Sequence, residues 1–130
     1  MNKASKIPQR GEMQSIPRRG EIWIIKCDKF KEFSKDQRPF LIISNDIQNQ
    51  FDELVAVVPL TTENVENVKS FEVFIKNTPK NGLDKPSKIV LNHPFTFSKE
   101  LRLKKCLGVV GSEIMNKTKK AWELAFDWEI

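Results

Sequence analysis

The chain is constrained most by a series of short apolar runs, rich in β-branched and aromatic residues and separated by polar or turn-forming ones. Runs of about four to eight such residues are typical of buried strands, and all are far shorter than the roughly 20 apolar residues that cross a bilayer. We predict strands at Glu21–Cys27, Phe40–Ser44, Leu54–Leu60, Ser70–Lys76, Lys88–Leu91 and Lys105–Val110.

The C-terminal part of the chain has helical rather than strand periodicity. Apolar residues recur at helical spacing between Ile114 and Ala125, and Ser112 is a plausible N-cap. A single helical turn is expected at Ser98–Leu101, whereas residues 28–37 and the polar connection Asn45–Glu53 are predicted as loops. Short strands followed by one terminal helix predict a mainly β (α+β) fold, with a strongly curved, barrel-like sheet capped by that helix.

One globular domain accounts for most of the 130 residues. Residues 1–17 contain almost nothing that packs and are expected to form a flexible tail, which leaves 18–130 as the domain. Within the tail, residues 7–13 are nearly repeated at 16–22, and only the second copy leads into a strand. The N-terminus lacks the apolar stretch of a secretory signal, so we expect a cytoplasmic protein without a membrane segment, and its two cysteines as free thiols.

The net charge of +5 is unevenly distributed along the chain. Residues 69–120 carry a net charge of +8, whereas residues 41–68 carry −5. A basic surface favours polyanions because each neutralised phosphate releases counterions, although scattered lysines also serve solubility alone. Charge therefore favours nucleic-acid binding without establishing it.

Metal and cofactor chemistry find little support in the sequence. One histidine and two separated cysteines make none of the usual zinc spacings, and the pair Asp52 and Glu53 is more typical of a solvated loop than of a magnesium site. A glycine-rich phosphate loop, a nucleophile elbow and a dinucleotide fingerprint are all missing. The remaining option is metal-free cleavage of RNA, whose own 2′-hydroxyl attacks the adjacent phosphorus.

Such a reaction needs a fixed cation for the developing oxyanion and groups that move protons. Arg38 fits the first requirement, because it begins an apolar strand and its guanidinium group is permanently charged. Pro39 follows it and stiffens the backbone that carries this group. Thr61, at the end of the next strand, is placed to offer a hydroxyl to the same phosphate, unless that hydroxyl only bonds its own turn.

Three motifs in order and at matching spacing resemble the MazF/PemK/Kid toxins. They are Arg19–Trp23, Arg38–Asp46 with Asn49, and Pro59–Thr62, and the similarity continues through Asn81–Leu83 and Ser87–Leu91 to cover roughly residues 18–126. The resemblance implies a small SH3-like barrel of the CcdB/MazF type, with five to seven strands and a C-terminal helix. It also implies a homodimeric type II toxin, inhibited by a cognate antitoxin, that cleaves single-stranded mRNA without a metal and leaves 2′,3′-cyclic phosphate and 5′-hydroxyl ends. Arg38 and Thr61 occupy the positions of the family's catalytic arginine and threonine.

The sequence departs from the family pattern after Leu91. Many relatives carry an acidic residue or glutamine followed by an Arg-Thr step, whereas this chain reads Asn92-His93-Pro94-Phe95-Thr96, so the expected arginine is Phe95. His93 is a third catalytic candidate as general acid or base, with a structural hydrogen-bonding role as the alternative.

The remaining candidates are expected to border the RNA. Glu32 and Asp36, in the loop before Arg38, are alternative proton carriers, although a solvated charged loop explains them as well. Phe51, in a polar loop, is suited to stacking on a base or to contact with a partner. Trp23 and Phe40, by contrast, are expected in the core. The predicted RNA-contacting residues are Arg19, Glu32, Asp36, Asn45, Asp46, Phe51, Thr62 and Asn92.

Two other functions remain compatible with the sequence. The same barrel serves as a non-catalytic, protein-binding poison in the gyrase-directed CcdB toxins, in which case toxicity would survive Arg38→Ala but depend on the C-terminal residues 128–130. A plain RNA-binding module would bind with a steep salt dependence and leave RNA uncut.

Overall fold

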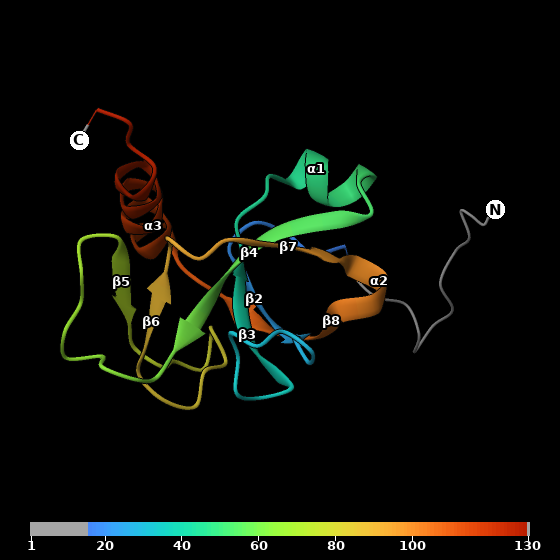
Figure 1. Cartoon of the computed structure of the whole chain (residues 1–130), viewed down its shortest axis with the longest axis horizontal. Coiled ribbons are helices and arrows are strands. Elements are labelled where there is room, and N and C mark those ends of the chain that lie inside the picture. The colour runs from blue at the N-terminus through green and yellow to red at the C-terminus, as the bar shows by residue number, and fades with distance from the viewer. Residues whose placement is uncertain (1–15, 130) are drawn as a thin grey trace.

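The computed structural model describes residues 16–129 and shows a seven-stranded antiparallel sheet with helices on it (Figure 1). The strands are β2 (Glu21–Lys26), β3 (Gln37–Ile42), β4 (Leu54–Thr61), β5 (Glu72–Ile75), β6 (Ser87–Val90), β7 (Phe95–Ser98) and β8 (Leu103–Val109), and the helices are α1 (Asp46–Phe51), α2 (Lys99–Arg102) and α3 (Ser112–Ala125). The first copy of the repeat, residues 7–13, lies outside the described residues, and the boundary at residue 17 stays a prediction.

The strand order is β5-β6-β4-β3-β2-β8, with β7 paired to β4 beside this path. The long strand β4 connects two parts of the sheet, because its first half pairs with β7 and its last two residues pair with β6. The two ends of the sheet meet through a loop, where the backbone N–H of Val109 donates to the carbonyl of Lys80 at 3.0 Å. The predicted mainly β fold with a C-terminal helix is confirmed.

Two hydrophobic cores lie on opposite faces of the central strands. The first is covered by α3, which Figure 1 shows above β5 and β6, and its buried members include Ile22, Leu41, Leu60, Ile89, Leu91 and Ala121. The second is largely aromatic and is built around Trp23, Ile25, Phe40, Val57 and Phe97. Trp23 and Phe40 are therefore core residues, as predicted.

Local structure differs from the predictions in three places. The connection predicted as a loop contains α1, because the Asn45 side chain accepts from the backbone N–H of Gln48 at 2.8 Å and the buried Asn49 donates to the carbonyl of Ser44. Helix α3 is preceded by Gly111 as its N-cap, not by Ser112. Strand β7 was not predicted. No helix within residues 16–129 is long and apolar enough to cross a membrane.

Candidate functional site

Arg38 lies near the start of β3, where its side chain is anchored on the neighbouring strand. Its Nη2 donates to the carbonyl oxygen of Leu60 at 2.6 Å, and its guanidinium carbon lies 4.9 Å from the centre of the Phe33 ring. Its buried Nε finds no hydrogen-bond partner within residues 16–129. Burial lowers the pKa of Arg38 below its ordinary value, against the opposing influences of Cys27 and Glu63, and an arginine remains charged in such a setting.

Thr61 is the last residue of β4 and follows Leu60, whose carbonyl oxygen accepts from the Arg38 guanidinium. The pairing of β3 with β4 runs from Ile42 with Val57 to Phe40 with Pro59, so Arg38 and Thr61 each lie two residues beyond its last pair. The Thr61 hydroxyl oxygen accepts from the backbone N–H of Glu63 at 3.1 Å, which is the turn interaction expected as the alternative, and its own O–H is left to donate.

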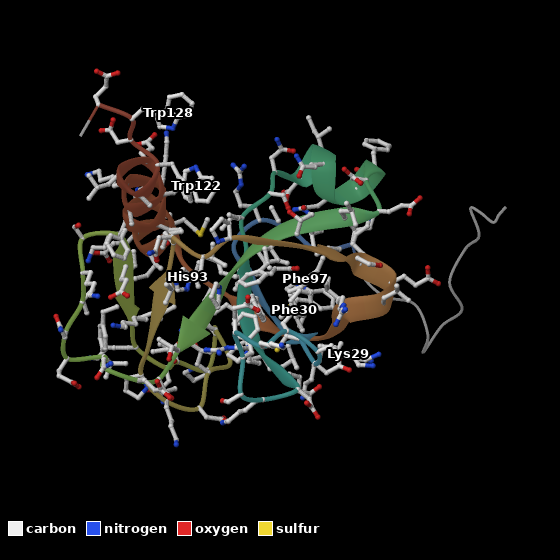
Figure 2. All side chains as sticks on the ribbon, viewed as in Figure 1. Lys29, Phe30, His93, Phe97, Trp122 and Trp128 are labelled. Atoms are coloured by element: carbon white, nitrogen blue, oxygen red, sulfur yellow. The ribbon has the colours of Figure 1, made fainter. Side chains whose placement is uncertain are left out.

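An aromatic cluster supports Arg38 from within the second core. The Phe33 ring under the guanidinium packs at 5.1 Å from Phe95 and at 5.5 Å from Phe40. Phe95, where the family pattern predicts arginine, therefore points into this cluster and supplies no charge. Phe30 and Phe97 complete it at a centroid distance of 5.3 Å, and Figure 2 shows these two rings together.

Lys88 pairs with Thr61 across β4 and β6. The residue is 6% exposed, and its ammonium group binds the Glu72 carboxylate at 2.9 Å and the carbonyl of Asn67 at 3.0 Å. The contact with Asn67 fixes the loop between β4 and β5, which leaves the sheet directly after Thr61. The sequence analysis missed this pair, although a lysine inside an apolar strand was a signal for it.

Glu72 makes the stability of this region depend on pH. Burial, the largest influence, raises its pKa, but hydrogen bonds from the backbone N–H of Lys69 and from Lys88 outweigh it, so that the pKa lies below the ordinary 4.5. Because the folded-state pKa is lowered, the carboxylate stabilises the fold fully above pH 4.5, and this contribution is lost as the pH falls through the lowered pKa.

We therefore expect Glu72→Gln to reduce the free energy of unfolding by about 1–3 kcal/mol at neutral pH, and by less in acid. Chemical denaturation of both proteins at neutral pH and at a series of values below 4.5 measures the difference. A difference that stays constant across this range would contradict the assigned role of the carboxylate.

Glu63 is a second residue that the sequence analysis missed. Its backbone bonds Thr61, and its negative charge raises the pKa of Arg38 against the effect of burial. The signal available in the sequence was its place directly after Thr61-Thr62. Thr62 is exposed beside it.

No three metal-ligating side chains come together anywhere in the described part of the chain.

Several predicted RNA-contacting residues gather at the opposite end of β3. The backbone N–H of Arg19 donates to the Asp46 carboxylate at 2.7 Å, its Nε donates to the carbonyl of Ile43, and Asn45 caps α1. Five steps along the extended chain from Arg38 to Ile43, at about 3.3 Å each, separate this cluster from Arg38 by roughly 17 Å. Phe51 is 77% exposed and lies at the C-terminal end of α1, the helix that begins at Asp46.

The other candidates form no hydrogen bond or ion pair with Arg38 within residues 16–129. His93 is exposed in the connection between β6 and β7, makes no hydrogen bond within residues 16–129, and lies beside β6, away from Phe30 and Phe97 (Figure 2). Its neighbour Asn92 has a buried side-chain oxygen without a partner in the same range. Glu32 and Asp36 are exposed in the loop between β2 and β3.

Comparison with known proteins identifies the family. Residues 18–126 match the model of the PemK-like, MazF-like toxin of type II toxin–antitoxin systems. The chain therefore belongs to this toxin family, as its motifs predicted. A search of curated proteins found no match.

Solved structures agree with this assignment. An endoribonuclease from a Mycobacterial species, in complex with its cognate antitoxin, is similar at 26% identity and a TM-score of 0.70, over 86% of this chain and 96% of that one. The Mycobacterium tuberculosis toxin MazF-mt6 is similar at 25% identity and a TM-score of 0.68, over 82% and 96%. A MazE–MazF complex from Deinococcus radiodurans, at 16% identity and a TM-score of 0.66 over 88% and 98%, shares the fold.

Proposed function

We propose that this toxin is a metal-independent, sequence-selective endoribonuclease of single-stranded mRNA, active as a homodimer and inhibited by a cognate antitoxin. The observation that carries the proposal is the Arg38 guanidinium, held on the carbonyl of Leu60, the residue before Thr61. The similar Mycobacterial proteins, which are described as endoribonucleases, one of them in complex with its antitoxin, support it.

In the proposed reaction the RNA 2′-oxygen attacks the adjacent phosphorus. A bond from the 2′-oxygen to phosphorus forms as the bond to the 5′-oxygen breaks, which gives a 2′,3′-cyclic phosphate and a 5′-hydroxyl. Arg38 stabilises the negative charge that develops on the phosphoryl oxygens, through the guanidinium N–H donors that its hydrogen bond to the carbonyl of Leu60 leaves free. The Thr61 hydroxyl donates to a neighbouring oxygen of the same phosphate.

The reaction also moves two protons, one from the 2′-hydroxyl and one to the departing 5′-oxygen. We assign the first to the Glu63 carboxylate, whose charge acts on Arg38, and keep His93 as a candidate for the second. Asn92, Thr62, Glu32 and Asp36 would then border the cleaved nucleotides. The cluster of Arg19, Asn45, Asp46 and Phe51 would contact RNA away from the cleaved bond.

The proposal is tested by incubating the purified toxin with long single-stranded RNA of mixed sequence in EDTA. We expect cleavage at a restricted set of sequences, with cyclic phosphate and 5′-hydroxyl ends identified by end labelling and mass spectrometry. RNA that stays intact, or products that carry 5′-phosphates, would refute the proposal.

Replacing Glu63 with glutamine is expected to lower kcat by about 10²-fold with little change in KM, because a positioned general base contributes roughly 10²–10⁴-fold. The measurement is the initial rate of cleavage of a short RNA that contains one site. Glu66→Gln, a neighbouring exposed carboxylate in the same loop, is the control and should keep the wild-type rate. Equal reductions of kcat in Glu63→Gln and Glu66→Gln would contradict the role of Glu63 as the general base.

A protein-directed poison is the second candidate function. The observation in its favour is Trp128, which is 94% exposed beyond α3, as Figure 2 shows. Growth arrest that survives Arg38→Ala and disappears with Trp128→Ser would favour this function over RNA cleavage.

A further inference from the structure

Two ion pairs form within residues 16–129, and the one between Lys88 and Glu72 is the more deeply buried, with side chains that are 7% and 8% exposed. Lys88 also pairs with Thr61 across the sheet. Taking two charges out of water carries a large cost, and apolar residues of similar volume often stabilise a fold as well or better. Stability alone therefore does not account for this ion pair.

The ion pair holds the connection between β4 and β5, residues 62–71, at two points (Figure 1). The Lys88 ammonium group donates to the carbonyl of Asn67 at 3.0 Å. Glu72 Oε1 accepts from that ammonium group and from the backbone N–H of Lys69, both at 2.9 Å. Most side chains of the connection are exposed. Because apolar packing contributes so little here, the position of the connection depends on these polar contacts.

The same connection carries groups that are assigned to the cleavage step. It begins directly after Thr61, whose hydroxyl oxygen accepts from the backbone N–H of Glu63 at 3.1 Å. A turn follows, in which Asn64 has a left-handed backbone with a φ of 54° and its carbonyl accepts from the backbone N–H of Asn67 at 3.0 Å. Only this turn separates Glu63 from the residue that Lys88 holds.

We propose that Lys88 is a positioning residue for RNA cleavage, which acts through the connection between β4 and β5 without touching the RNA. Its hold on Asn67 keeps the turn in place. The turn then directs the Glu63 carboxylate and the Thr61 hydroxyl at the phosphate that Arg38 binds. This inference rests on the proposed ribonuclease function. A displacement of about 1 Å at a reacting group can cost roughly 10²-fold in rate, so a contact remote from the RNA can decide kcat.

The test replaces the ion pair with apolar side chains of similar volume, in the double variant Lys88→Met/Glu72→Leu of the full-length toxin. This variant leaves no unpaired charge in the sheet, so its Tm should stay near that of the wild type. We expect kcat for an RNA with one site to fall about 10–100-fold with little change in KM, because Arg38 still binds the phosphate while the connection is released. Asp28→Leu/Arg102→Met, which removes the other ion pair within residues 16–129, is the matched control and should keep a near-normal kcat.

Hydrogen exchange separates positioning from a general loss of structure. In Lys88→Met/Glu72→Leu the backbone N–H groups of Glu63 and Asn67 should exchange about 10-fold faster, although the acceptors of both groups are unchanged. The backbone N–H groups of β3 and β4 should exchange as in the wild type. Glu72→Gln, which is nearly isosteric, is a milder second variant and should show both effects to a smaller degree.

Wild-type kcat and wild-type exchange in Lys88→Met/Glu72→Leu would overturn this inference while leaving the proposed function intact. A fall in kcat without faster exchange of Glu63 and Asn67 would overturn it as well, because the connection would then not be the route. If the double variant does not fold, the same two measurements on Glu72→Gln decide. Wild-type toxin that leaves RNA intact would refute the proposed function, and this inference with it.

Discussion

Replacing Arg38 with alanine is expected to lower the rate of RNA cleavage by about 10³-fold, because removal of one donor that stabilises an oxyanion costs roughly 10²–10³ in kcat. Arg38→Lys keeps the charge but loses the planar guanidinium, which can bind the carbonyl of Leu60 and still offer further N–H donors to a phosphate. We therefore expect lysine to recover only a small part of the lost rate. The measurement is single-turnover cleavage of a short RNA that contains one site.

Arg102 is the matched control for this prediction. It also lies over aromatic rings, 5.0 Å from the centre of Phe30 and 5.8 Å from that of Phe97, and it pairs with Asp28 instead of facing Thr61. Arg102→Ala should therefore keep a near-normal cleavage rate. Similar losses in Arg102→Ala and Arg38→Ala would show that Arg38 only supports the aromatic cluster, and would contradict its role in catalysis.

The strands were predictable because each contains its own run of apolar residues, which the sequence shows directly. β2, β3 and β4 are apolar over most of their length, and their predicted positions differ from the observed ones by only a few residues. β7 was missed because the short Phe-Thr-Phe-Ser run becomes a strand through its pairing with Leu54–Val57. Alternation of Phe95 and Phe97 toward the aromatic core was the available signal.

The candidate site was only partly predictable, because it depends on strand register. Arg38 and Thr61 were candidates from the sequence and the family resemblance, but only the pairing of β3 with β4 brings Arg38 to the carbonyl of Leu60, next to Thr61. The same register brings Lys88 beside Thr61, which no local pattern indicates. Asn45 and Asp46, although close to Arg38 in sequence, lie at the far end of β3, because an extended strand separates residues that are neighbours in the chain.

Replacing Gly108 with alanine is expected to destabilise the fold by about 3 kcal/mol or more, because this glycine lies where the two ends of the sheet meet. A Cβ atom at this position would lie 2.1 Å from the carbonyl oxygen of Lys80 and 2.7 Å from the carbonyl carbon of Asn81. Both atoms belong to backbone that a rotamer change cannot move. Thermal unfolding should show a fall in Tm of roughly 10 °C.

Gly111 provides the control, since a Cβ atom there meets nothing within 4 Å. Gly111→Ala should lower the free energy of unfolding by only a fraction of the loss expected for Gly108→Ala, because alanine is a less favourable N-cap of α3 than glycine. Equal stability of the two variants would mean that the loop from Thr78 to Gly82 moves away from β8 at little cost, and that the sheet does not depend on this contact to bring its ends together.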